Sequence, residues 1–302
     1  MLTGLTPDPV ESGIIEAVPQ LGGRAAGYWR FETMGGITNR TYRVSGAGEV
    51  FVLRIAAEST HYLDRAAEAH NARVAGRLGI APPVLHADGR VMLTGYLAGA
   101  RPMQLEDFAD PQRLDQVAGL LRHLQRSPEP FIGARHPFGE IDKYLGLHPH
   151  PRSLALRRAA EPIAAAIATA TLGSVPAHVD PNPANFLLCP DGALRMVDWE
   201  FSAMTDPCWD VGAILSMMPR DAERMRRFVA AVLGHADGAV LARVALFRAA
   251  MFLVAGSWCA MEAAFRGDSG LAAMAESYLD RFAAALADAE MPRWLSGHFS
   301  AA

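Results

Sequence analysis

Three oxygen-bearing side chains lie close together in the sequence, in a pattern that suits phosphoryl transfer. His178 and Asp180 are followed by Asn185, in a His-x-Asp-x-x-x-x-Asn spacing, and Asp198 ends the next apolar stretch. Carboxylate and amide oxygens suit Mg²⁺, which is usually held together with substrate phosphates. A carboxylate that does not bind the metal can accept the proton of an attacking hydroxyl. These residue types therefore predict a magnesium-dependent phosphoryl-transfer site.

A β-hairpin is expected to bring these side chains together. Two short apolar runs flank the turn sequence Pro-Asp-Gly at residues 190–192, which is typical of antiparallel strands joined by a tight turn. A turn centred between Asp191 and Gly192 pairs residues whose numbers sum to 383. That register sets Asn185 opposite Asp198. Taken one at a time, the same residues could serve only as turn, cap or strand-end residues, and it is their combination that favours a site.

A glycine pair near the N-terminus is a candidate phosphate-binding loop. Gly35 and Gly36 lie between two strand-like segments and are followed by Thr38 and Asn39. Glycine lets the backbone approach a ligand closely, and successive backbone N–H groups can hold phosphate oxygens. The alternative is an ordinary turn.

One strand and the helix after it carry a candidate ion pair. Arg54 shares a strand face with Val50 and Val52, and Glu68 lies on the helix expected over 61–78. In protein kinases a strand cation held by a helix glutamate binds the α and β phosphates. Arginine would do so here as a rigid fork. The alternative is an arginine and a glutamate that are both solvated at the surface.

The composition excludes several classes of protein. The chain has 302 residues, 51% of them hydrophobic, and a formal charge of −4 with no basic block. Non-specific nucleic-acid binding needs clustered positive charge, so no nucleic-acid partner is expected. Lys143 is the single lysine, which excludes a P-loop.

The compartment is expected to be the reducing cytoplasm. There are three cysteines, and the first thirteen residues lack a basic-then-apolar signal pattern; an odd, low cysteine count argues against a disulfide scaffold. The longest weakly charged run lies between Arg248 and Glu262. It is shorter than the roughly 20 residues that a bilayer needs, so we expect a core helix and no membrane insertion.

The order of strand-like and helical segments predicts an α+β, bilobal chain. The first third reads mainly as strands, with a hairpin around residues 45–48, and the rest reads mainly as helices. We expect a β-rich nucleotide-binding lobe over 1–96 and a helical catalytic and substrate-binding lobe over 97–302. The helices expected after residue 100 are 111–126, 152–170, 207–218, 221–234, 239–265 and 270–288.

Taken together, these features resemble the choline/ethanolamine kinase family, which belongs with the aminoglycoside phosphotransferases in the protein-kinase-like superfamily. The resemblance covers about residues 30–285. It rests on the segments 35–40, 52–55, 178–185, 198–200 and 206–212, together with Glu68. It implies a bilobal kinase-like fold and ATP and Mg²⁺ as cofactors. A homodimer is also expected on this ground alone.

The resemblance implies a role for each residue of the phosphoryl-transfer site. Asp180 would be the catalytic base, with His178 as a structural member of its loop. Asn185 and Asp198 would bind Mg²⁺. Asp210 would hold the catalytic loop from the following helix; the alternative for Asp210 is helix capping alone, with Asp206 as the N-cap.

The resemblance also implies how ATP would be held. Arg54, oriented by Glu68, would contact the α and β phosphates. The loop of Gly35, Gly36, Thr38 and Asn39 would cover them.

The phosphoryl acceptor would be a small amino alcohol, choline or ethanolamine. Its cation would need aromatic faces and carboxylates, and the expected substrate contacts are Glu200, Trp199, Trp258 and Asn182. The small residues over 254–256 leave a thinner aromatic cage, which keeps ethanolamine open beside choline. The alternatives are a kinase for another hydroxyl compound, such as an aminoglycoside or a sugar, and a nucleotide-binding regulator without turnover.

Overall fold

The structure is a computed structural model that describes residues 13, 15–24, 27–35, 39–57, 60, 62–169 and 172–299. The fold is α+β, and the chain packs into two compact units. The first comprises Met1–Pro102 and Phe186–Phe201, and the second comprises Met103–Asn185 and Ser202–Ala302. The expected division at residues 96 and 97 differs from these units, because 97–102 and the hairpin at 186–201 pack with the N-terminal segment.

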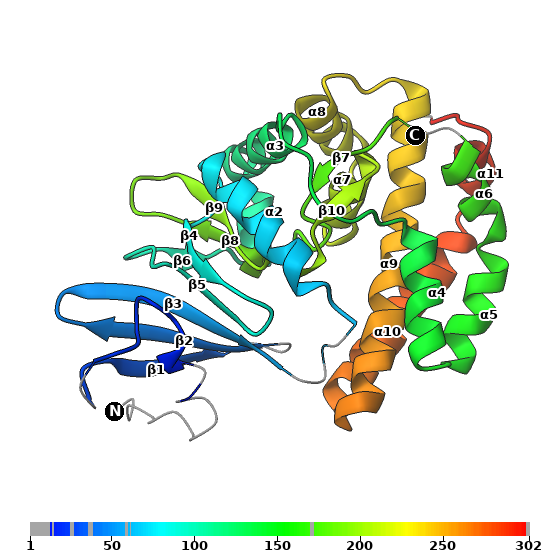
Figure 1. The fold of residues 1–302 in the computed structure, drawn as a ribbon. Helices are drawn as coiled ribbons and strands as arrows, with labels where there is room; N and C mark the ends of the chain where they lie inside the picture. The colour runs from blue at the N-terminus through cyan, green and yellow to red at the C-terminus, as the bar shows by residue number, and fades with distance from the viewer. Residues whose placement is uncertain are drawn as a thin grey trace. The chain divides into compact units, whose positions relative to one another are not determined.

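The first unit contains a five-stranded antiparallel sheet in the order β1-β2-β3-β5-β4 (Figure 1). Its strands are β1 (Arg30–Gly35), β2 (Asn39–Gly46), β3 (Glu49–Ala56), β4 (Val84–Ala87) and β5 (Val91–Gly95). The predicted hairpin is the β2–β3 pair, whose turn residues Ala47 and Gly48 have φ of 47° and 86°, as the favoured hairpin turns require. Along β3, Leu53 and Ile55 enter the core, so the side chain of Arg54 lies on the opposite face.

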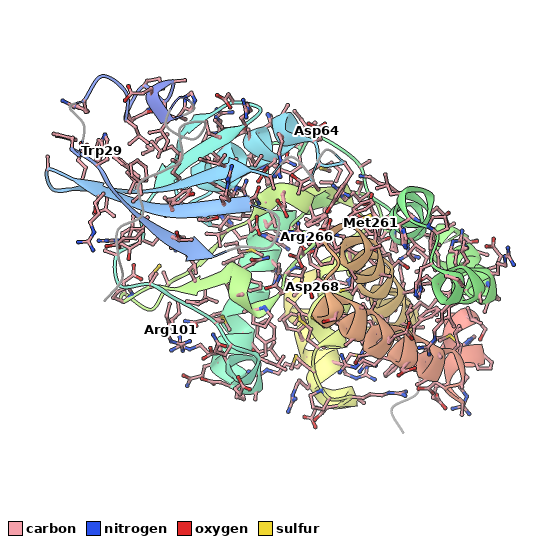
Figure 2. The ribbon with its side chains drawn as sticks, turned by 90° about the horizontal axis from the view of Figure 1, so that it is seen from below. Trp29, Asp64, Arg101, Met261, Arg266 and Asp268 are labelled. Carbon is pink, nitrogen blue, oxygen red and sulfur yellow. The ribbon has the colours of Figure 1, made fainter. Side chains whose placement is uncertain are left out.

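Helix α2 (Arg65–Arg77) follows β3 in the first unit. It begins four residues after the expected start because Asp64 is its N-cap. The Asp64 carboxylate accepts hydrogen bonds from the N–H groups of Ala66 and Ala67 at 3.0 and 2.9 Å, and Figure 2 labels Asp64 at this end of the helix. N-capping of this kind satisfies donors that the first turn leaves unpaired.

A small second sheet in the first unit corrects the predicted hairpin register. It has the order β6-β8-β9, formed by β6 (Arg101–Pro102), β8 (Phe186–Leu188) and β9 (Leu194–Met196). Phe186 pairs with Met196, so paired residue numbers sum to 382 and not to 383. The prediction that Asn185 stands opposite Asp198 is therefore wrong by one residue. The turn is a three-residue loop ending at Gly192, whose φ is 82°, and such loops shift the register relative to a two-residue turn.

The second unit is mainly helical. Its helices are α3 (Pro111–Gln125), α4 (Pro137–Leu147), α5 (Pro151–Ala159), α6 (Glu161–Thr169), α7 (Cys208–Ser216), α8 (Ala222–Leu233), α9 (Gly238–Arg266), α10 (Ser269–Leu286) and α11 (Met291–Leu295). The helix expected over 152–170 is two helices, α5 and α6. The sequence analysis predicted neither α4 nor α11. A two-stranded ladder, β7 (Val175–Ala177) with β10 (Ala203–Thr205), completes this unit.

Helix α9 lies at the centre of the second unit and runs beside α10 (Figure 1). It has 29 residues and is long and apolar enough to cross a membrane by length and composition, which corrects the expectation that this segment is too short. Within the second unit, 72% of its most apolar window is buried. Such burial is typical of a core helix, and core helices can also be long and apolar enough to meet the length and composition criterion for a membrane span.

Candidate active site

In the first unit, the predicted ion pair between Arg54 and Glu68 is present. The same guanidinium also donates to Asp198, with 2.6 Å between Nη1 and Oδ1. β3 supplies Arg54, the first turn of α2 supplies Glu68, and Asp198 follows the β8–β9 hairpin. Asp198 has a left-handed backbone with φ of 66°, which aspartate tolerates better than most residues. One arginine therefore joins two carboxylates that are far apart in the sequence.

The sequence analysis missed a second arginine in this cluster. Arg65 begins α2, and its guanidinium donates to Glu68 at 2.8 Å, to Glu200 at 3.0 Å and to Asn39 at 3.0 Å. A further N–H donates to the hydroxyl of Thr60 at 2.6 Å. Burial lowers the pKa of Arg65, and the nearby Glu200 carboxylate acts in the opposite direction. The only sequence signal for Arg65 was its i,i+3 spacing from Glu68.

Two residues predicted to contact ligands are hydrogen-bonded to each other. Asn39 donates its side-chain amide to Glu200 at 2.8 Å, and the Glu200 side chain is 2% exposed. Trp199 is 4% exposed and donates from its indole N–H to the carbonyl of Met196 at 3.3 Å. These contacts suit residues that position others. Gly35 ends β1, while the predicted loop residues Gly36 and Thr38 lie outside the described residues.

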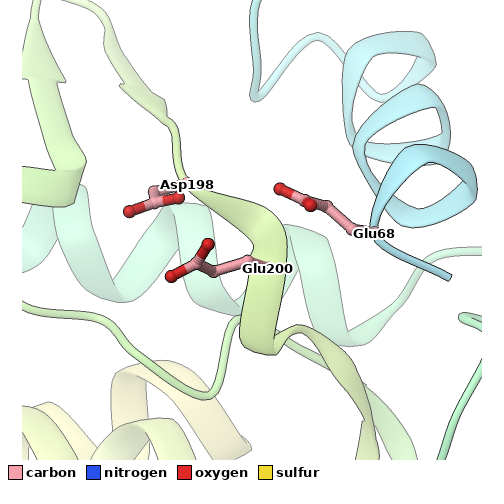
Figure 3. A group of neighbouring side chains, drawn as sticks. All are labelled: Glu68, Asp198 and Glu200. Atoms are coloured by element: carbon pink, nitrogen blue, oxygen red, sulfur yellow. The ribbon is translucent and has the colours of Figure 1, made fainter. Parts of the chain in front are cut away.

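Three carboxylates gather in this cluster, as Figure 3 shows. One oxygen of each of Glu68, Asp198 and Glu200 lies within 4.8 Å of the others. Arg54 joins Glu68 to Asp198, and Arg65 joins Glu68 to Glu200. The side chains of Glu68 and Glu200 are each 2% exposed, whereas that of Asp198 is 37% exposed. Asp198 is therefore the carboxylate of the three that a cation from solvent could reach.

In the second unit, the predicted catalytic base Asp180 accepts hydrogen bonds from two side-chain amides of its own loop. Asn182 donates to Oδ2 of Asp180 at 3.0 Å, and Asn185 donates to the same oxygen at 3.1 Å. Asn185 also donates to the backbone carbonyl of Asp180 at 2.9 Å. The amide nitrogen of Asn185 is thus directed at Asp180, and its amide oxygen is the atom suited to a metal.

Asp210 of α7 holds the backbone of this loop, as the sequence analysis expected. Its carboxylate accepts hydrogen bonds from the N–H groups of His178 and Val179, both at 2.8 Å. Trp209 donates its indole N–H to the carbonyl of Val179 at 2.9 Å. Val179 has φ of 72°, a strained conformation for a β-branched residue that persists only where surrounding contacts enforce it. Burial raises the pKa of Asp210, and the nearby His178 acts in the opposite direction.

The start of α7 corrects a smaller prediction. The helix begins at Cys208 with Pro207 as its N-cap, one residue later than expected. Asp206 accepts a hydrogen bond from the N–H of Cys208 at 2.9 Å and also forms a buried ion pair with Arg243 of α9 at 2.5 Å. Asp206 therefore helps the helix start and also anchors it to α9.

An aromatic pair lies on α9 and α10 in the same unit as Asp180. Trp258 and Tyr278 pack, half-buried, against a shared apolar cluster. Gly256 lets the helices meet closely, because a Cβ there would lie 2.8 Å from the side chain of Leu279 and 3.3 Å from Cβ of Tyr278. Burial raises the pKa of Tyr278, and Asp180 adds to that rise. Residues 254–256 of α9 carry no aromatic ring, and Tyr278 of α10 supplies one beside Trp258 in the same cluster.

Comparison with known proteins identifies the family. Residues 33–247 match the Phosphotransferase enzyme family. Protein LicA of Haemophilus influenzae is 29% identical over 194 residues, which are 61% of this chain and 57% of that protein. The chain therefore spans little more than half the length of this relative.

Solved structures agree with this match. A choline/ethanolamine kinase family protein from Mesorhizobium loti is 30% identical, with a TM-score of 0.79, over 95% of this chain and 97% of that one. Choline kinase LicA from Streptococcus pneumoniae has the same fold, with a TM-score of 0.78 at 21% identity, over 92% of this chain and 99% of that one. The chain thus belongs to the Phosphotransferase enzyme family and, within the protein-kinase-like superfamily, to the choline/ethanolamine kinase family.

Proposed function

We propose that this protein transfers the γ-phosphoryl group of ATP to the hydroxyl of a small amino alcohol, choline or ethanolamine. The hydroxyl oxygen forms a bond to the γ-phosphorus, and the bond from that phosphorus to the β–γ bridging oxygen breaks, which releases ADP. The hydroxyl proton passes to the carboxylate of Asp180. The observation that carries the proposal is the fixed loop around Asp180, whose carboxylate and carbonyl are both hydrogen-bonded by neighbouring amides.

The chain's own residues contribute mainly position and charge, as phosphoryl transfer requires. Asp210 and the amides of Asn182 and Asn185 fix the orientation of the Asp180 loop. Arg54 is held by Glu68 and offers a planar fork suited to phosphate oxygens.

The proposed Mg²⁺ ligands are Asp198 and Asn185. Their donor atoms, a solvent-accessible carboxylate and an amide oxygen, fit a hard cation. A bound Mg²⁺ would neutralise charge on the ATP phosphates.

The charges in the second unit favour a small monocation over a polycation. An aminoglycoside site would need several carboxylates without other partners. Among the late-helix acids, Glu262 pairs with Arg266, Asp268 caps α10, and Glu276 pairs with Arg152; Figure 2 labels Arg266 and Asp268 where α9 passes into α10.

The aromatic faces of Trp258 and Tyr278 suit a single ammonium group through cation–π attraction. Substrate contacts by Glu200, Trp199 and Asn182 stay predictions. In the structure, Glu200 accepts from Asn39, Trp199 donates to the carbonyl of Met196, and Asn182 donates to Asp180. A cytoplasmic location and a homodimer are proposals of the same kind.

The test is ADP release from Mg-ATP in the presence of choline, ethanolamine, aminoglycosides and simple sugars. We expect stimulation by choline or ethanolamine alone. Asp180→Asn should lower kcat at least about 100-fold, the range for loss of a general base, while ATP binding changes less than about twofold. Asp280→Asn is the matched control, because this carboxylate is 70% exposed on α10 and its substitution removes only a surface ion pair with Arg152.

Two other outcomes would point elsewhere. Stimulation by aminoglycosides or sugars alone would assign a different acceptor to the same chemistry. ATP binding without ADP release, with every acceptor tried, would favour a nucleotide-binding regulator.

A further inference from the structure

A cavity lies against α9 and α10, and its lining does not include Trp258 or Tyr278. It has a volume of about 520 Å³ and is lined by residues of the second unit, among them Arg248, Phe252 and Arg281. This volume falls within the range of small-molecule pockets. Arg248 precedes Trp258 by ten residues on α9, which places them about 15 Å apart along the helix axis.

The cavity is electropositive. Arg248 and Arg281 both line it, and neither forms an ion pair with a carboxylate among the residues the structure describes. The lining carboxylate of Asp288 is paired with Arg220 at 2.6 Å. Burial lowers the pKa of Arg248, the cations Arg220 and Arg281 lower it further, and the carboxylate of Asp288 acts in the opposite direction. The lining thus carries two guanidinium groups and one carboxylate, and that carboxylate is already paired with Arg220.

Arg248 is fixed in place by the backbone. Its Nε–H donates to the carbonyl of Leu215 at 2.9 Å, and a second N–H donates to that of Met218 at 3.4 Å. Its guanidinium lies 5.8 Å from the ring centre of Phe252, and that of Arg281 lies 5.2 Å from the same ring. The two cations are therefore positioned around one aromatic side chain before any ligand arrives, which lowers the entropic cost of binding.

Other parts of the lining are apolar. Leu105 is 50% exposed, and Met217, another lining residue, is partly exposed. Alanines of α10 complete this wall. An inorganic ion would leave this apolar surface uncovered, whereas a ligand with an apolar body would bury it.

We infer that this cavity binds a small organic anion, with a carboxylate or phosphate group on Arg248 and Arg281 and an apolar or aromatic body against Leu105 and Met217. Arginine forks recognise both kinds of anion through paired hydrogen bonds. The inference stands on the geometry of the second unit alone and does not depend on the proposed reaction.

The test is calorimetric titration of the full chain with 2-naphthoate, 2-naphthyl phosphate and neutral 2-naphthol, each with and without saturating Mg-ATP. We expect saturable binding of at least one anion, unaffected by Mg-ATP, and no binding of 2-naphthol. Comparing the two anions distinguishes a carboxylate site from a phosphate site.

Two variants and a control locate the binding. Arg281→Gln should weaken anion binding at least about tenfold, since it removes a charged partner at the protein surface. Ala284→Glu places a carboxylate in the lining and should weaken anion binding by at least as much as Arg281→Gln does. Arg158→Gln changes an exposed arginine of α5 outside this lining and should leave affinity within about twofold.

Three results would overturn the inference. Equal binding of 2-naphthol would show an apolar site without anion recognition. Equal losses in Arg281→Gln and Arg158→Gln would show general electrostatic attraction. Binding that Mg-ATP displaces, and that Arg54→Gln rather than Arg281→Gln removes, would place the anion at the nucleotide phosphate site.

Discussion

Replacing Arg65 with methionine tests whether this residue holds the charge cluster of the first unit together. Methionine keeps an unbranched apolar stem and removes the guanidinium. That group makes four hydrogen bonds, to Glu68, Glu200, Asn39 and Thr60, and its side chain is only 13% exposed. We therefore expect Arg65→Met to leave carboxylate charge buried without its partner.

The expected cost follows from what each carboxylate keeps. Removing one partner of a buried ion pair typically costs about 3–5 kcal/mol. Glu68 retains its contact with Arg54, and Glu200 retains the amide of Asn39, so we expect the lower end, about 3 kcal/mol. Adding four charged hydrogen bonds at about 1.5 kcal/mol each would give roughly 6 kcal/mol. This sum is an overestimate, because all four bonds come from the same side chain and are not independent.

The assay is native-state hydrogen exchange of the β2, β3 and α2 amides, because two units can unfold separately and a single melting curve would mix them. Arg73→Met is the control on the same helix: Arg73 is exposed and reaches only the carbonyl of Ala87 at 3.4 Å, so its loss should cost under about 0.5 kcal/mol. A double-mutant cycle of Arg65→Met with Glu200→Gln should show a coupling of about 1–3 kcal/mol.

Either of two results would refute this reasoning. A cost of Arg65→Met no larger than that of Arg73→Met would mean that the buried carboxylates do not need the guanidinium. Additive effects of Arg65→Met and Glu200→Gln would mean that their 3.0 Å contact contributes nothing to stability.

Three further predictions follow from single contacts. Asp210→Asn leaves one of two backbone N–H groups without an acceptor, so it should cost about 1–3 kcal/mol in thermal unfolding and lower kcat. Burial raises the pKa of Cys259 from 9.0 to about 12, and the residue is 2% exposed. Burial also raises the pKa of Cys189, but that thiol is only partly buried, so mass spectrometry after iodoacetamide at pH 8 should find Cys189 labelled and Cys259 unlabelled. Because the folded state favours the protonated thiol of Cys259, this group's contribution to stability is present below pH 9 and is lost as pH rises toward 12. Gly256→Ala should wedge α9 from α10 and cost about 1–3 kcal/mol, whereas Gly146→Ala, whose added Cβ meets no atom within 4 Å, should be neutral or stabilising.

Each of these has a contrary outcome. Unchanged melting and kcat in Asp210→Asn would mean that the loop keeps its strained backbone without the carboxylate. Labelling of Cys259 at the rate of Cys189 would mean that α9 opens readily. Equal stability of the two alanine variants would mean that α9 and α10 shift apart at no cost.

The pair of Arg54 and Glu68 was predictable because each half had a local signal. Arg54 interrupts a β-branched strand face, and Glu68 lies on the next predicted helix. Arg65 had no comparable signal: it stands at a helix start, where an arginine reads as solvated. Its partners Asn39 and Glu200 are 26 and 135 residues away, so only the tertiary fold shows what it does.

The hairpin shows a different limit of sequence analysis. Its existence followed from Pro190, Asp191 and Gly192 between apolar runs, but its register did not. Two-residue and three-residue loops use similar residues, and the choice depends on which residue adopts positive φ, here Gly192 alone. A one-residue error in the turn becomes a one-residue error along both strands.

The order of charged contacts in the first unit gives Asp198, Glu68 and Glu200 different surroundings, which the composition of the chain could not show. Along the chain of contacts, Asp198, Arg54, Glu68, Arg65 and Glu200 alternate in sign. Each arginine thus neutralises part of two carboxylates, and only the terminal Asp198 remains accessible to solvent. A cation that bound Asp198 would compete with Arg54 for this carboxylate. Arg54 would keep its ion pair with Glu68, and the N–H groups that now contact Asp198 could then donate to phosphate. In this order Asp198 is the accessible end and Glu200 the buried end, and Glu68 contacts two arginines where the sequence analysis assigned it one.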